Sequence, residues 1–211
     1  MGLRERKKAE TRERIADVAA GLFAARGYDE VSVVDVARAA EVSDQTIYNY
    51  FPTKQDLVLD RAEEIRERYG RVVRERATGT SPAAALRPLV LEDIDRLRLE
   101  PPELARGEFP AQCLVSPVLR RFALEERERQ ADAITASLAA TDPEVPTIVA
   151  RAHAAALVSV VQTITDAIGA AVLASDRSDP LVARLIHDAT DALDDLDRTF
   201  RSVTTARTGN A

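Results

Sequence analysis

Apolar residues recur every three or four positions near the start of the chain, at the spacing that lines one face of an α-helix. The first such stripe consists of Ile15, Val18, Ala19, Leu22 and Phe23. It predicts a helix from about Arg4 to Arg26. Gly27 can adopt the left-handed conformation that commonly ends a helix, and Tyr28 follows it.

Three helix starts are predicted in quick succession after this helix, because Ser32, Ser43 and Thr53 each stand where an N-cap residue is expected. Ser32 and Thr53 each precede an Asp by three positions, the spacing of a capping box. We expect a short helix after Ser32, a tight break at Glu41 and a second short helix that ends before Pro52. A longer helix is expected from Thr53 to about residue 76.

Two short helices joined by a tight turn form a helix-turn-helix, which exposes one face of its second helix. In a helix over residues 44–50, Ile47 and Phe51 lie one turn apart and can anchor it. The polar side chains then point largely elsewhere, and they are Gln45, Thr46, Tyr48 and Asn49. Gln and Asn can read adenine edges in the major groove of DNA, and a Thr methyl group can contact thymine. The alternative is a small helical subdomain whose tyrosines only cover apolar surface.

The rest of the chain alternates between apolar helical stripes and short breaks rich in Pro, Gly, Ser and Asp. The breaks lie at 78–82, 100–103, 141–146 and 175–180. They predict helical segments of roughly 18 to 28 residues and no sheet, since no stretch alternates with period two. The predicted fold class is therefore all-α.

Charge is distributed unevenly along the 211 residues, although the net charge is −6. Residues 1–54 carry nine basic and nine acidic residues, including all three lysines, whereas residues 55–211 carry 20 basic and 26 acidic residues. The stretch up to Arg14 has six basic and three acidic residues. A basic start on a neutral segment fits a nucleic-acid-binding part, but by itself a basic N-terminus is more often a solvated helix start.

Residues Glu10 to Val58 resemble the DNA-binding domain of the TetR family of transcriptional regulators. The resemblance is carried by "LF…RGY" at residues 22–28, the Ser32 start, "VS" at 42–43 and "TIYNYFPTK" at 46–54. It implies a helix-turn-helix DNA-binding domain at 1–54 and a larger helical ligand-binding and dimerisation domain at 55–211. It also implies a homodimer that binds a double-stranded, palindromic DNA operator. The resemblance places Thr46, Tyr48, Asn49 and Tyr50 on family DNA-contact positions and Lys54 on the phosphate-contacting lysine of the family. The helix starts Ser32 and Ser43 and the polar Gln45 complete the predicted DNA-binding residues.

Two residues depart from the family pattern. Glu41 occupies a turn position where the family often has Gly, which costs about 1 kcal/mol if the backbone there is left-handed. Asp44 stands where a basic or neutral residue is common, so it repels phosphate unless it accepts a hydrogen bond from cytosine or caps the helix.

The last two predicted helices are unusually apolar. The segment of about 146–174 is apolar nearly all round, which requires burial on more than one side, either within the domain or by pairing with a second copy, as the family resemblance implies. The resemblance further implies a small-molecule effector, unidentified and largely apolar, for which Gln162, Thr163 and Asp166 are candidate contacts. Polar core residues with internal hydrogen bonds are the alternative for these side chains.

Other functional classes have little support in the sequence. The lone Cys113 could serve a helical enzyme together with a histidine, but Gly-rich phosphate loops and nucleophile elbows are lacking, so no catalytic residue, cofactor or metal ligand is assigned. The apolar run 154–173 is interrupted by polar residues, so we expect a cytoplasmic protein without a membrane span. A repressor released by an effector is the favoured function. An activator, or a regulator controlled by a protein partner, remains an alternative.

Overall fold

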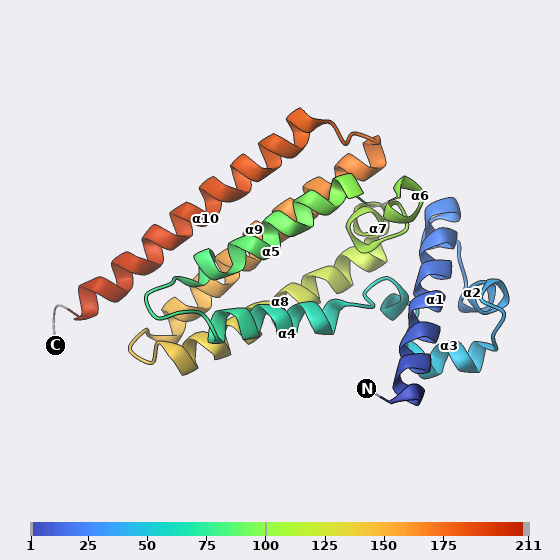
Figure 1. Cartoon of the computed structure of the whole chain (residues 1–211), viewed down its shortest axis with the longest axis horizontal. Coiled ribbons are helices and arrows are strands. Elements are labelled where there is room, and N and C mark those ends of the chain that lie inside the picture. The colour runs from blue at the N-terminus through green and yellow to red at the C-terminus, as the bar shows by residue number, and fades with distance from the viewer. Residues whose placement is uncertain (1, 100, 209–211) are drawn as a thin grey trace. The chain divides into compact units, whose positions relative to one another are not determined.

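The computed structural model describes residues 2–99 and 101–208 of the chain, and no strand occurs among them (Figure 1). The all-α class predicted from the pattern is confirmed. The helices are α1 (Leu3–Arg26), α2 (Val33–Ala39), α3 (Asp44–Tyr50), the 3₁₀ helix η1 (Gln55–Leu57), α4 (Ala62–Arg74), α5 (Pro82–Leu99), α6 (Pro102–Ala105), α7 (Phe109–Val115), α8 (Pro117–Thr141), α9 (Thr147–Ala174) and α10 (Asp179–Thr208).

The chain forms two compact units. The first unit comprises Met1–Arg61, Glu100–Phe122 and Ile168–Asp176, and the second comprises Ala62–Leu99, Ala123–Ala167 and Arg177–Ala211. The first unit therefore contains α1 to α3 and η1 together with two segments that come from much later in the chain. The predicted division at residue 54 stays a proposal, because the helix-turn-helix packs together with these later segments rather than alone.

The core of the first unit is built from the apolar stripes of α1 to α3. Its largest fully buried side chains are Ile15, Phe23, Val31, Ile47, Phe51 and Leu119. The Phe23 ring packs against Tyr28, with ring centroids 5.4 Å apart, as expected for a residue that folds back beyond the Gly27 cap. The helix predicted from about Arg4 to Arg26 is thus confirmed.

The long helix predicted from Thr53 does not begin there. Thr53 does pair with Asp56, whose carboxylate accepts hydrogen bonds from the Thr53 N–H and hydroxyl at 2.8 Å each. This box opens only the short 3₁₀ helix η1, and α4 begins at Ala62. Within this interruption, Arg12 of α1 donates to the Asp60 carbonyl at 2.7 Å, which fixes the segment against α1.

The segment between Glu100 and Thr141 is also more broken than the pattern predicts. It holds two short helices, α6 and α7, before α8. Gly107 and Ser116 separate them, and α7 and α8 each have a Pro in their first turn, where the missing N–H costs no intrahelical bond.

The segment with α6 and α7 packs tightly within the first unit. A Cβ on Gly107 would overlap the backbone of Ala20 in α1, and one on Gly169 would overlap the backbone of Pro110. Only glycine allows so close an approach of two backbones. Residues 106–110 are therefore held against α1 on one side and against the end of α9 on the other.

The second unit packs α4, α5 and α10 with most of α8 and α9, and its longest helices are seen in Figure 1. Its largest fully buried side chains are Leu86, Ile94, Ile134, Leu138, Leu157 and Leu193. Ion pairs join its helices at the margins of this core. Arg66 of α4 pairs with the buried Glu126 of α8 at 2.9 Å, and Arg98 of α5 pairs with Asp179 of α10 at 2.8 Å.

The helix α9 is long and apolar enough to cross a membrane, judged by length and composition alone. Half of its most apolar window is buried inside the protein, so it packs as a core helix. Its outward face within the second unit carries mainly small side chains. The exposed positions along this face are Ile148, Ala152, Ala155, Ser159 and Thr163.

Candidate nucleic-acid interface

The start of α3 is fixed by its own cap. The Ser43 hydroxyl accepts the Thr46 N–H at 3.1 Å and lies 2.8 Å from the Thr46 hydroxyl. Ser32 caps α2 in the same way, and its partner Asp35 accepts from both the N–H and the hydroxyl of Ser32. These hydrogen bonds hold the pKa of the Asp35 carboxyl below its usual value. Both N-caps predicted from the sequence are confirmed.

The turn between α2 and α3 has the geometry of a Schellman motif. The Val42 N–H donates to the Ala37 carbonyl at 3.0 Å, and the Glu41 N–H donates to the Arg38 carbonyl at 3.2 Å. This motif requires a left-handed residue at Glu41, whose φ is 54°. Glu41 therefore has the left-handed backbone for which the family often uses glycine at this position.

Two apolar side chains pin α3 from beneath. Ile47 and Phe51 are both 0% exposed. The guanidinium of Arg12 on α1 lies over the Phe51 ring, 4.7 Å from its centroid, a distance typical of a cation–π contact. Arg14 of α1 donates to the Ala40 carbonyl at the end of α2. The anchoring of α3 predicted from the sequence is confirmed.

The opposite face of α3 is open to solvent. Gln45 and Asn49 are exposed, and Tyr48 is 47% exposed, a large fraction for an aromatic side chain. Thr46 and Tyr50 are half-buried at the edges of this face. The Gln45 side-chain amide donates to the Asn49 side-chain carbonyl at 3.3 Å. The structure therefore brings the predicted base-reading residues together on one accessible surface.

Asp44 lies at the first position of α3 and is exposed. One of its carboxylate oxygens accepts the Gln45 N–H at 3.0 Å. A carboxylate in the first turn is favoured by the helix dipole. The Asp44 carboxylate therefore satisfies one N–H of the first turn, while the N-cap itself is Ser43.

Lys54 follows α3 and is half-buried. Its ammonium donates to the Tyr28 carbonyl at 2.6 Å and lies 4.0 Å from the centroid of the Tyr28 ring. Burial lowers the pKa of Lys54 from its usual value, partly offset by Asp29 and Glu30. Burial also raises the pKa of the Tyr28 hydroxyl to about 12. An ammonium has three N–H donors, so the bond to Tyr28 leaves donors for a further acceptor.

The candidate effector residues on α9 are only partly brought together. Gln162 is 7% exposed and donates to Asp166 at 2.7 Å, and Arg127 of α8 lies 3.5 Å from the same carboxylate. Thr163 lies on the exposed face of α9 and donates to the carbonyl of Ser159 in its own helix.

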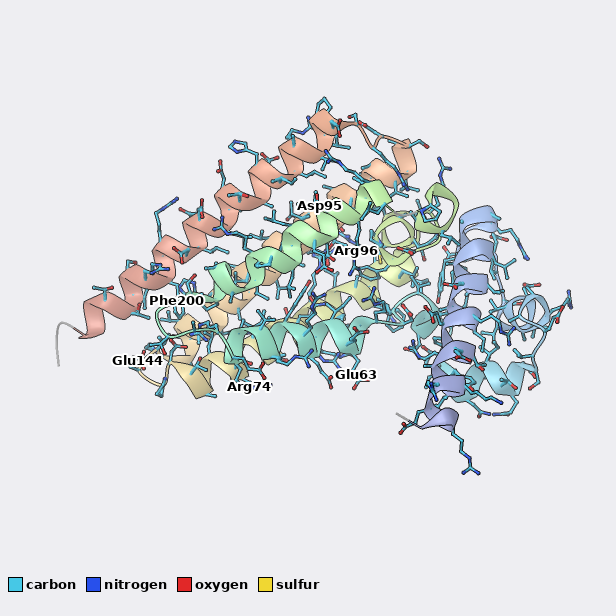
Figure 2. The ribbon with its side chains drawn as sticks, viewed as in Figure 1. Glu63, Arg74, Asp95, Arg96, Glu144 and Phe200 are labelled. Carbon is cyan, nitrogen blue, oxygen red and sulfur yellow. The ribbon has the colours of Figure 1, made fainter. Side chains whose placement is uncertain are left out.

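A shallow recess lies elsewhere in the second unit, against α10. Its lining residues are Pro82, Ala83, His153, Leu157, Leu196 and Phe200. The ring of Phe200, labelled in Figure 2, meets His153 edge to face at 5.1 Å between centroids. Burial lowers the pKa of His153. The recess encloses no cavity of the roughly 300–1,000 Å³ found in ordinary ligand pockets, and the candidate effector residues do not line it.

One residue of the first unit, Gln112 of α7, was not singled out by any sequence pattern. It is 4% exposed, and its side chain binds the end of α1 and the turn that follows. These two partners lie more than 80 positions away in the chain, beyond the reach of local patterns.

Residues 15–60 match the model of the family described as bacterial regulatory proteins, tetR family. They span α1 from its first buried position through η1, so they include every element that positions α3. Residues 15–60 therefore carry the TetR-family helix-turn-helix.

One curated relative is the HTH-type transcriptional regulator TcmR of Streptomyces glaucescens, 33% identical to this chain over 85 residues. The alignment covers 40% of this chain and 38% of TcmR, so the chain matches less than half the length of that relative.

Solved structures match over most of the chain. NalD of Pseudomonas aeruginosa, described as the secondary repressor of the MexAB-OprM multidrug efflux pump, matches with a TM-score of 0.58 and 18% identity, over 88% of this chain and 97% of NalD. FadR of Bacillus subtilis, solved in complex with stearoyl-CoA, matches with a TM-score of 0.56 and 20% identity, over 88% of this chain and 97% of FadR. At these identities the likeness establishes a shared fold across both units.

Proposed function

We propose that this protein is a TetR-family transcriptional repressor that binds a palindromic DNA operator as a homodimer and is released by a small-molecule effector. The observation that carries the proposal is the exposed polar face of α3, pinned from beneath by Ile47 and Phe51. An α-helix fits the major groove of B-DNA. The DNA-binding part is residues 1–54 and the regulatory part is residues 55–211.

Base recognition is assigned to the polar side-chain groups on the exposed face of α3. The hydrogen bond between Gln45 and Asn49 uses one Gln N–H and the Asn oxygen. It leaves the Gln45 oxygen and the Asn49 amide N–H groups for base edges, and it fixes the direction of both side chains. The Thr46 methyl group supplies an apolar contact for a thymine methyl.

Phosphate contacts are assigned to groups around this face. Hydroxyl, ammonium and N-terminal amide groups all bind phosphate oxygens without reading sequence. The candidate phosphate contacts are Ser32, Ser43, Tyr48, Tyr50 and Lys54. The exposed basic residues on the first turns of α1, Arg4, Arg6, Lys7 and Lys8, add positive charge to the same unit.

The dimer is assigned to α9 and α10. The exposed face of α9 carries Ala152, Ala155, Ser159 and Thr163. Such small side chains allow another helix to approach closely, since the distance between packed helices depends on the side chains at the contact. A two-fold dimer presents two copies of α3, and these must lie about 34–36 Å apart to enter successive major grooves on one side of DNA.

The effector is assigned to the second unit and is a largely apolar small molecule. The similarly folded FadR was solved with stearoyl-CoA, which supports a site for such a ligand in this fold. Gln162 and Asp166 are the candidate polar contacts, because both are partly buried and oriented by their mutual hydrogen bond. An effector lowers operator affinity only by its difference in affinity for the two conformations.

The test is direct. Genomic fragments retained by the purified protein at moderate salt are sequenced, and a palindrome shared among them is used as a fluorescent duplex for anisotropy titration. The proposal expects a dimer in sedimentation and at least about a thousandfold preference over scrambled DNA. A protein with no preference for any palindrome would overturn it. A reporter gene under the recovered operator, with and without the protein, separates repression from activation in the cytoplasm.

A further inference from the structure

The helix α7 supports the turn after α1 through one buried side chain. The Gln112 oxygen accepts the Tyr28 N–H at 3.0 Å, while its amide nitrogen donates to the carbonyls of Phe23 at 3.3 Å and Arg106 at 2.6 Å. The Phe23 carbonyl, in the last turn of α1, also accepts the N–H of Gly27 at 2.8 Å. Gln112 therefore adds a second hydrogen bond to that carbonyl and joins the end of α1 to the Tyr28 N–H and the Arg106 carbonyl.

Tyr28 connects this support to the end of α3. Its N–H is held by Gln112 and its carbonyl by the ammonium of Lys54. Its ring is 3% exposed and lies beneath the same ammonium. Lys54 comes four positions after Tyr50, the last residue of α3. A continuous set of contacts thus runs from Gln112 through Tyr28 to Lys54.

The surrounding packing leaves little room for Tyr28 to shift. Gly107 lies directly against the Ala20 backbone. Ser116, which is 2% exposed, donates through its hydroxyl to the Asp29 carboxylate at 2.9 Å. The chain around α7 is therefore held against α1 before Gln112, at Gly107, and against the turn that follows α1 after Gln112, at Ser116.

We propose that Gln112 is a positioning residue for operator binding. It lies outside the helix-turn-helix and holds Tyr28 so that the Lys54 ammonium stands where a DNA phosphate can meet it. This inference rests on the proposed operator binding, and it makes Lys54 both a partner of Tyr28 and a phosphate contact.

The effect of Gln112 should appear in the salt dependence of operator binding. Each phosphate contact contributes about 0.9 to the slope of log affinity against log salt. Gln112 is uncharged and buried, so a change in that slope on its substitution has to pass through a charged group. Gln112→Met keeps the volume and removes all three hydrogen bonds. We expect about tenfold weaker affinity and a slope reduced by about one.

A double-mutant cycle tests whether the effect passes through Lys54. Lys54→Met alone should also weaken affinity about tenfold and reduce the slope by about one. The operator affinity of the double variant should lie within about threefold of that of Lys54→Met alone, because coupled residues do not contribute additively.

Ser137→Ala is the matched control. The Ser137 hydroxyl is 3% exposed and donates to the Gly70 carbonyl at 2.7 Å within the second unit, so its loss also removes a buried hydrogen bond. We expect wild-type affinity and slope for this variant. If Gln112→Met does not fold, Gln112→Asn can replace it. Its side chain is one methylene shorter, so the amide hydrogen bonds lengthen, and affinity and salt slope should change in the same direction by a smaller amount.

The outcomes separate the two proposals. If the wild-type protein prefers no palindrome, the proposed function fails. If the wild type binds and Lys54→Met lowers the slope while Gln112→Met does not, operator binding stands and the positioning role of Gln112 is overturned. If Lys54→Met leaves the slope unchanged, or the two substitutions add fully, the connection through Lys54 is overturned.

Discussion

Replacing Glu41 with glycine should stabilise the protein, because Glu41 is held in a left-handed conformation. Its φ is 54°, and two backbone hydrogen bonds of the Schellman motif prevent it from relaxing. The Glu41 side chain is exposed. The substitution therefore changes the backbone preference of this position with little loss of packing.

The magnitude follows from two opposing terms. A residue with a Cβ in this region costs about 1–2 kcal/mol relative to the right-handed conformation, and glycine avoids that cost. Glycine loses more backbone entropy on folding, worth about 0.5–1 kcal/mol. The expected net gain is about 0.5–1 kcal/mol in the free energy of unfolding. For a chain of this size that raises Tm by about 1–4 °C.

Urea unfolding followed by circular dichroism measures this gain as a shift of the midpoint at unchanged slope. Glu41→Ala is the control, since it removes the same charge but keeps the Cβ. We expect Glu41→Gly to exceed Glu41→Ala in stability by at least about 0.5 kcal/mol. Equal stabilities for the two variants would show that the turn stores no strain at this position.

Three further predictions concern other parts of the chain. Asn49→Ala should relax operator preference at particular base pairs and weaken the binding free energy for the preferred sequence by about 1–3 kcal/mol. Tyr48→Phe should weaken binding to all sequences alike. Titration of a panel of single-base operator variants separates the two effects. Gly107→Ala should destabilise the protein by about 1–3 kcal/mol, because the added Cβ overlaps the α1 backbone. Gly21→Ala should stabilise it by about 0.5–1 kcal/mol, because no atom lies within 4 Å of the added Cβ. Urea midpoints that shift in the same direction for both variants would contradict this. Burial lowers the pKa of His153 from 6.5, so the folded protein favours its neutral form. The free energy of unfolding should therefore fall as the pH drops below 6.5. The loss of stability between pH 7.5 and 5.5 should be smaller in His153→Leu than in the wild type, and an equal loss in both proteins would contradict this.

The sequence was most informative where local chemistry decides the structure. The caps at Ser32 and Ser43 and the buried pair Ile47 and Phe51 follow from spacing within a few residues. The left-handed turn position at Glu41 was raised by the family resemblance. These features suffice to predict the direction of α3 and the exposure of its outer face.

The sequence failed where distant contacts override a local signal. Thr53 and Asp56 form the expected capping box, yet the helix that the box predicts is interrupted in the segment where Arg12 contacts Asp60 and Lys54 contacts Tyr28. Gln112 has no local pattern at all, since its role depends on a turn more than 80 positions earlier.

The distribution of amino groups has a practical consequence. Lys7, Lys8 and Lys54 are the only lysines of the chain, so apart from the terminal amine every amine-directed reaction falls on the first unit. Acetylation of Lys54 would remove its charge and its ability to hold the Tyr28 carbonyl as an ammonium. Reagents or acetyltransferases that modify lysine would therefore act on the side chains of the first unit and leave those of the second unit chemically unchanged.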